Sequence, residues 1–450
     1  MKGLRLIGMG CLLAVAALLG AGFLLGGERS AIDWSAQRAV VFESDDWGLA
    51  GFTPSAAAWE GLDRSALAPG RFPQVYWGST LEDSAQVADL AAVLAGARGR
   101  DGLPAVLQPN YVMGSQELQG ESFRTIALPG FPRAYDRPGM WRAVGAACTT
   151  GVWYPELHAA WHYDPARRRE PALRYGTPRQ ATERGILLFP GSEEAWELGP
   201  WRRLPVLENE LTNSQAVFAR AFGRPAGSVI APDYTWNARI ESMWQRYGLR
   251  VIQGKREQRN PDLPRGRVGR IAKLLERRWS KLVHPGRVYL ERNCRFEPVQ
   301  SPEPATVTAR CADEIRAAWR RGEPAIVETH RVNFAHVDPA IPAVGRAELA
   351  RLLADVEADG PVFLTDTEVA QLAVRGVSAR PVMGTGIVLR NGSRSRRVVA
   401  VGPPAFDREF MIQNADLAGY FPQPCLVALP AGAAALMKPS LSGWQFVPLP

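Results

Sequence analysis

The sequence contains few cysteines and few histidines. Five of each occur among 450 residues, and no two cysteines stand in a C-x-x-C arrangement. A metal site made of cysteine ligands is therefore not expected. The chain also lacks zinc-finger, RNA-recognition and phosphate-loop motifs, so its formal net charge of +8 does not indicate a nucleic-acid partner. A basic surface that keeps the protein soluble near a membrane explains this charge better.

Only one long apolar run is present, and it lies at the N-terminus. Residues 7–27 carry no charged side chain, and Lys2 and Arg5 precede them. The run can cross a bilayer core of about 30 Å, and it exceeds the core of a cleaved signal peptide, about 7–15 residues. We predict a signal anchor within residues 1–30, with a cleaved signal peptide as the alternative. The basic flank then places the rest of the chain outside the cytoplasm, on the periplasmic or extracellular face.

After the predicted anchor, strand-like and helix-like segments alternate. The expected strands are 39–44, 104–112, 152–157, 227–232, 249–254, 324–330 and 361–365. The expected helices are 81–98, 213–223, 237–248, 312–322 and 345–360. This alternation is typical of an α/β protein with a parallel sheet, either open or closed into a barrel.

Two segments depart from the alternation. Residues 255–310 are rich in arginine, proline and polar groups, which indicates a long insertion. From residue 376 onward, glycine, proline and short apolar runs predict a small β-rich C-terminal module, residues 376–450, with a hairpin across residues 386–402. The main domain is therefore expected to span residues 31–375.

Polar residues gather where the predicted strands end. Asp45 and Asp46 follow the first strand, and each later group follows another strand: His158 with His162, Asp233 with Tyr234, and Thr329 with His330. The carboxyl ends of parallel strands meet at one edge of a sheet or barrel, where active sites are built. A common site is therefore expected at this edge.

His158 and His162 have the spacing of metal ligands. On a helix, residues four apart lie on one face, and two imidazoles with a carboxylate from Asp46 make a sufficient ligand set for zinc. The cation would keep Asp46 ionised beside Asp45, and Asp45 would then act as a base toward a metal-bound water. The alternative is a pair of capping or surface histidines and an ordinary aspartate turn.

Four motifs in this order resemble those of the polysaccharide deacetylase family, also called the NodB-homology family. They are "ESDDWG", "HAAWH", "APDYTW" and "VETH", and they are spread over residues 38–375. The resemblance implies that Asp45 is the catalytic base and that Asp46, His158 and His162 hold the metal. It implies further that His330, which from the residues alone is either a general acid or an ordinary buried histidine, protonates the leaving group.

The third of these motifs departs from the family pattern. Tyr234 is kept, but Ala231 stands where the family has the arginine that steadies the base. A backbone N–H near Tyr234 is expected to stabilise the oxyanion. Trp47 and Trp236 lie beside the motifs and are candidates for stacking on sugar rings, although core packing is the more frequent role of such aromatics.

The resemblance implies an irregular (β/α) barrel, often of seven strands, with zinc-dependent N-deacetylation of an N-acetylated sugar in a polysaccharide. Two alternatives stay open. Asp45 could act with Glu156, Glu208 or Glu210 in glycoside hydrolysis, or the chain could be a non-catalytic, membrane-tethered protein for glycan binding or assembly. The expected partners are the polysaccharide and, through the N-terminal helix, the inner membrane; the sequence does not determine the oligomeric state.

Overall fold

The computed structural model describes residues 32–64, 67, 74–173, 176–188, 197–254, 259–263, 266–284, 286–401, 425–440 and 443–450. The predicted anchor, residues 1–30, lies outside this part of the chain. Within the described ranges, no helix combines the length and the apolar character that a membrane-spanning segment needs.

In the described part of the chain, the main sheet consists of nine parallel strands. Eight of them follow the order β8-β7-β6-β5-β2-β1-β10-β9, and β11 pairs with the beginning of β1. The strands are β1 (Ala39–Trp47), β2 (Leu107–Val112), β5 (Glu156–Ala159), β6 (Ser228–Val229), β7 (Val251–Gly254), β8 (Val288–Glu291), β9 (Cys294–Arg295), β10 (Ala325–His330) and β11 (Val362–Phe363). A parallel sheet was expected, and the pairing confirms it.

The two ends of this sheet meet on one short segment of chain. Only Arg292 and Asn293 separate β8 from β9. The amide of Arg292 donates to the carbonyl of Gly254 on β7 (2.8 Å), and the amide of Asn293 donates to Ile326 on β10 (3.1 Å). The segment therefore pairs first with one edge of the sheet and then with the other, which gives the sheet a barrel-like form. The sheet has more than the expected seven strands for two reasons. One segment of the chain forms both β8 and β9, and the two-residue strand β11 is also part of the sheet.

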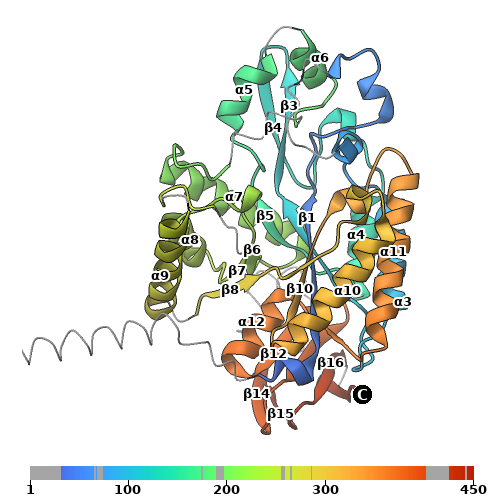
Figure 1. Ribbon diagram of the computed structural model, residues 1–450, viewed down its shortest axis with the longest axis vertical. Coiled ribbons are helices and arrows are strands. Elements are labelled where there is room, and N and C mark those ends of the chain that lie inside the picture. Colours follow the sequence, from blue (N-terminus) through green and yellow to red (C-terminus); the bar gives the residue numbers. More distant parts are fainter. Residues whose placement is uncertain are drawn as a thin grey trace, which may run out of the picture.

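This pairing also corrects the expected insertion. Residues 255–310 contain β8, β9 and the beginning of α10 (Pro304–Arg320), so part of the segment belongs to the barrel. Its polar composition misled the sequence interpretation because two of its arginines, Arg287 and Arg292, are buried in ion pairs. Helix α9 (Arg267–Val283) is the part that lies on the outside, beside α8 (Figure 1).

Strand β1 is buried along its whole length and alternates between two environments. Val40 and Phe42 belong to the large core that includes the surrounding helices, whereas Ala39 and Val41 pack with apolar residues of β7 and β10. Because alternate side chains of a strand point to opposite faces, the side chain of Asp45 points to the same face as Val41, the barrel interior. The periodicity of β1 thus carries a carboxylate into the barrel.

Helices flank the sheet on both sides (Figure 1). Helices α3, α4, α10 and α11 lie on one side and α7, α8 and α9 on the other. The α-helices are α2 (Trp34–Gln37), α3 (Ser84–Gly96), α4 (Met140–Thr149), α5 (Pro165–Leu173), α6 (Thr177–Glu183), α7 (Leu204–Phe222), α8 (Ala238–Arg246), α9, α10, α11 (Ala340–Glu357) and α12 (Asp366–Arg375). Cys311 on α10 and Cys294 on β9 are buried free thiols, so they form no disulfide with each other.

The remaining strands form small antiparallel sheets. They are β3 (Gly114–Gln119) with β4 (Ser122–Ala127), and the C-terminal strands β12 (Val377–Val382), β13 (Gly386–Asn391), β14 (Arg397–Val401), β15 (Cys425–Leu429), β16 (Ala434–Ser440) and β17 (Gly443–Pro448). The expected hairpin across residues 386–402 is wrong, because β13 pairs with β12 and β16 whereas β14 pairs with β15. Pairing with strands more distant in the sequence prevails over the local turn signal.

One close helix contact gives a test of this packing. A Cβ atom on Gly345 of α11 would lie 1.7 Å from the carbonyl oxygen of Asn333, just after β10. We expect Gly345→Ala to lower the free energy of unfolding by about 1–3 kcal/mol, because the crowded backbone must move. A Cβ on Gly145 of α4 would meet nothing within 4 Å, so Gly145→Ala should raise stability by about 0.5–1 kcal/mol. Urea unfolding measures both, and an unchanged Gly345→Ala variant would contradict the close contact.

Candidate metal centre

The two neighbouring aspartates at the end of β1 point to different places. The pairing of β1 with β2 shifts register between Ser44 and Trp47, and Asp46 has a φ of 73°. This irregularity breaks the alternation of the strand. Asp45 therefore stays in the barrel interior, where it pairs with Arg292, while Asp46 turns toward His158 and His162. Asp45 pairs with the guanidinium of Arg292 and Asp46 with two imidazoles, so the two neighbouring carboxylates have separate partners.

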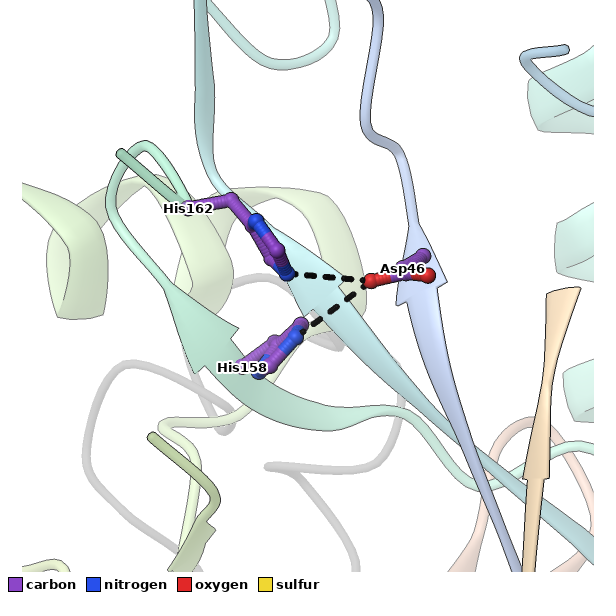
Figure 2. Close-up of side chains that lie close together, drawn as sticks. All are labelled: Asp46, His158 and His162. Carbon is purple, nitrogen blue, oxygen red and sulfur yellow. Dashed lines mark ion pairs between the residues drawn. The ribbon is translucent and has the colours of Figure 1, made fainter. Parts of the chain in front are cut away.

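Asp46, His158 and His162 converge on one point (Figure 2). The Oδ1 atom of Asp46 lies 3.5 Å from Nε2 of His158 and 3.2 Å from Nε2 of His162. One potential ligand atom from each residue lies within 4.8 Å of the others. Bonds of about 2.0–2.1 Å to a tetrahedral zinc place its ligands roughly 3.3 Å apart. The separations to Asp46 fit a shared divalent cation, as the sequence predicted.

The two histidines do not share a helix, which corrects the sequence interpretation. His158 belongs to β5, and His162 lies in the turn that follows, with a φ of 70°. Nδ1 of His158 lies 3.1 Å from the carbonyl oxygen of Ile230. A proton on Nδ1 donates to this carbonyl and leaves the Nε2 lone pair free for a cation. A tight turn after a strand thus produces the convergence that was expected from a helical face.

Glu197 fixes the turn that carries His162. Its carboxylate accepts hydrogen bonds from three successive amides, those of Ala160 (2.9 Å), Trp161 (2.9 Å) and His162 (2.7 Å). Burial raises the pKa of Glu197, although these amides act in the opposite direction. No sequence motif marks Glu197, because a single glutamate far from the histidine motif carries no recognisable pattern.

Asp45 is clamped by an arginine that the sequence interpretation had not assigned. Arg292 donates from Nη1 to Oδ2 of Asp45 (2.6 Å) and from Nη2 to Oδ1 (2.7 Å), and Asn110 donates to Oδ1 as well (2.8 Å). Burial by itself would raise the pKa of Asp45, but Arg292 outweighs burial and lowers this pKa far below its ordinary value. Ala231 stands at the position where the family pattern has an arginine, and Arg292 from the β8–β9 connection reaches the aspartate instead.

The same guanidinium group has three further partners. Arg292 donates to Glu43 (2.6 Å), to the hydroxyl of Tyr234 (2.8 Å) and to Gln253 (3.0 Å). Arg292 and Glu43 are fully buried, and burial raises the pKa of Glu43 to about 8 although Arg292 acts in the opposite direction. A bidentate arginine is a geometrically specific partner for a carboxylate, so this network sets the orientation of Asp45.

Tyr234 belongs to this network, whereas a backbone N–H near it was expected to stabilise an oxyanion. Its hydroxyl donates to Glu328 (2.8 Å) while it accepts from Arg292, and its backbone amide donates to the carbonyl of Ala231 (3.1 Å). The amide of Thr235 is also engaged, with Pro232. The amides of Tyr234 and Thr235 are therefore committed to a local turn, which leaves neither of them for an oxyanion.

His330 lies beside Asp45 at the end of β10 and pairs with a glutamate. The two residues are partners in the register of β1 and β10. Nδ1 of His330 lies 2.5 Å from Oε1 of Glu297, whose other oxygen accepts from Asn333 (2.7 Å). Burial disfavours the charged imidazole, but Glu297 outweighs burial and raises the pKa of His330 to about 10. His330 is therefore protonated at neutral pH, as a general acid must be.

Trp47 and Trp236 are not placed for stacking on a sugar. Trp47 is buried against Trp153, with the ring centroids 4.7 Å apart and the rings nearly perpendicular, and its Nε1 donates to Ser44. Trp236 is fully buried and donates to Glu241. Both therefore have the core-packing role that was weighed as the alternative.

The three glutamates considered for glycoside hydrolysis all pair with arginines. Glu156 pairs with Arg224, Glu208 with Arg246 and Glu210 with Arg202. Asp45 takes part in none of these pairs, since its own partner is Arg292. The stretch "RNCRFEP", residues 292–298, supplies both Arg292 and Glu297 to the site.

Comparisons with known proteins give distant likenesses only. No family model and no curated protein sequence matches the chain. Among solved structures, a candidate polysaccharide deacetylase from Mycobacterium smegmatis is similar with a TM-score of 0.37 and 13% identity, covering 74% of this chain and 89% of that one. An endo-beta-1,4-mannanase from Cellulomonas fimi is similar with a TM-score of 0.28 and 11% identity, covering 94% and 97%. These likenesses assign no role to any residue.

The Arg292 network gives a prediction about stability. We expect Arg292→Met to lower the free energy of unfolding by about 3–5 kcal/mol, because Asp45 would stay buried without its counter-charge. Arg316→Met removes an arginine that pairs with Asp355 and Asp359 at the surface, and it should cost no more than about 1 kcal/mol. Equal losses in urea unfolding would show that the buried network does not support the fold.

The pair between His330 and Glu297 predicts a dependence of stability on pH. The folded-state pKa of His330, about 10, lies above its ordinary value of 6.5. The folded state therefore binds this proton more tightly, and its stabilisation is full below pH 6.5 and is lost as the pH rises through about 10. We expect His330→Gln to lack this loss. Urea midpoints of both proteins across this range measure the difference, and parallel pH profiles would contradict the assignment.

Proposed function

We propose that the chain is a metal-dependent hydrolase that removes acetyl groups from an N-acetylated polysaccharide. One observation carries the proposal: the ligand atoms of Asp46, His158 and His162 converge directly beside Asp45, whose partner in the strand register is the protonated His330. A candidate cation site, a clamped carboxylate and an acid thus occupy one edge of the barrel. Metal-assisted amide hydrolysis uses these three functions.

Asp46, His158 and His162 would hold the cation, and zinc suits their ligand types. A divalent cation bound there lowers the pKa of a water ligand toward about 7 and polarises a carbonyl group. Asp45 accepts the proton of the attacking water, with Arg292 and Asn110 determining the direction of its oxygens. Its low pKa makes Asp45 a weak base, so the base role would require a cation that acidifies the water.

His330 gives its proton to the departing amine. Its raised pKa means that nearly every molecule carries this proton at pH 7, and Glu297 orients the imidazole through Nδ1. Nε2 is then the atom that donates the proton. The assignment requires that loss of His330 impairs turnover without removing the ligands of the cation.

Two other functions receive less support from the arrangement. A non-catalytic glycan-binding protein was suggested by the missing motif arginine, but Arg292 occupies the corresponding place beside Asp45. A glycoside hydrolase would need a second carboxylate working with Asp45, and the glutamates considered for it are paired elsewhere. The location of the proposed enzyme, anchored by residues 1–30 with the barrel outside the cytoplasm, remains part of this proposal.

Metal removal tests the proposal directly. The chelated protein should release no acetate from N-acetylglucosamine oligomers, and added zinc should restore the release. Asp46→Ala should bind no stoichiometric metal and should lose more activity than the roughly 10–100-fold that removal of a supporting residue causes. Asp355→Ala, a surface aspartate paired with Arg316, serves as the matched control.

The products separate the three candidate functions. Free acetate that depends on metal supports the deacetylase. New reducing ends that a chelator leaves unchanged indicate glycoside hydrolysis, and glycan binding without any product indicates a binding protein. Acetate release that persists in Asp46→Ala would show that the three converging side chains are not the catalytic centre.

A further inference from the structure

Helix α9 has an apolar side formed by Val268, Ile271, Leu275, Trp279 and Val283, which we call the α9 apolar face. These residues recur at intervals of three and four along the helix, so they lie on one side of it. The helix runs along the outer edge of the molecule beside α8 (Figure 1). An amphipathic helix of a globular protein ordinarily turns this side toward the core.

In α9 the orientation is reversed. The exposed fractions of Val268, Ile271 and Trp279 are 69%, 57% and 64%, and Leu275 and Val283 are also exposed. They account for a large share of the strongly exposed large hydrophobic residues in the described part of the chain. A cluster of this kind on one helix marks a surface that contacts an apolar partner.

The opposite, polar side of α9 is the side that packs on the barrel. Ser280 is buried and accepts a hydrogen bond from the hydroxyl of Tyr289 (2.9 Å), and Asn260 donates to Glu276 (2.9 Å). The guanidinium of Arg277 lies over the ring of Tyr289 at 5.3 Å. Turning the helix inward would break these contacts, so the polar side determines that the apolar face points outward.

The charges around the face indicate the nature of the partner. At 100° per residue, Arg267 and Arg278 stand next to the apolar face along one of its edges. An apolar stripe with tryptophan and a basic border is the pattern of helices that lie in the interface of an anionic bilayer. A second copy packed on the same face would risk bringing its basic edge near this one, and like charges facing each other are unfavourable.

We propose that the α9 apolar face docks on an anionic phospholipid surface, with the helix lying in the plane of the membrane. The docking uses neither the metal ligands nor Asp45, so it stands independently of the proposed hydrolase function. Together with the anchor predicted in residues 1–30, it would give the barrel a second attachment. Two attachments determine how the carboxyl edge of the barrel faces the membrane, whereas one leaves it free to rotate.

Hydrogen–deuterium exchange of the full chain in lipid nanodiscs tests the docking. The discs contain phosphatidylcholine alone or an equal mixture with phosphatidylglycerol. We expect the amides of α9 to exchange roughly tenfold more slowly in the anionic discs, which corresponds to about 1.4 kcal/mol of docking free energy. High salt should reduce the difference, because screening weakens the attraction between arginines and lipid head groups.

Glutamate substitutions on α9 and on α12 distinguish docking through the α9 apolar face from a nonspecific effect of added negative charge. Val268→Glu combined with Trp279→Glu should abolish the difference between the two kinds of disc. Val374→Glu alters a valine that is 55% exposed on α12 and should leave the difference unchanged. Exchange in peptides of β1 and β10 reports whether each variant is folded.

Two results would overturn the proposal. Equal exchange of α9 in neutral and anionic discs would show that lipid does not cover the face. Protection of α9 in detergent that grows with protein concentration would show that a second copy covers it. Hydrolytic activity is not part of this readout, so its absence would leave the docking result intact.

Discussion

The buried ion pair between Arg292 and Asp45 is the constraint on which the rest of the site depends. Removing a guanidinium and a carboxylate from water is costly unless every charge and donor finds a partner. Here Arg292 donates to both oxygens of Asp45 and also to Glu43, Tyr234 and Gln253, residues from three different parts of the barrel. The network therefore joins β1, β7 and the β8–β9 connection at the edge where the candidate metal centre lies.

The geometry of β1 separates two chemical functions within two residues. Regular alternation carries Asp45 into the interior, where a fixed positive charge holds it ionised. The register shift that follows turns Asp46 to the opposite partners, His158 and His162. A strand that kept its alternation would send Asp46 to the outer core, and no cation site could form. Local irregularity at the end of a strand is thus a functional feature of this fold.

At both the candidate metal centre and α9, hydrogen bonds made by polar groups decide how the chain is oriented. At the candidate metal centre, hydrogen bonds hold buried polar groups in place, as Glu197 shows with its three amide donors. On α9, polar groups satisfied by the barrel leave the apolar residues outside. In both places hydrogen bonding decides the orientation, and on α9 it leaves the apolar face exposed.

The sequence by itself determined the alternation of strands and helices, and it indicated Asp46, His158 and His162 as residues that meet. Those predictions rest on periodicity and on the order of elements, which are local properties of a chain. Only the tertiary structure decided that His162 lies in a turn, that Trp47 and Trp236 are buried, that the arginine comes from position 292, and that residues 288–295 belong to the barrel. Each of these depends on contacts between residues far apart in the chain. An ion pair such as that of Arg292 with Asp45 spans 247 positions, and no local pattern records which distant partner a buried charge will find.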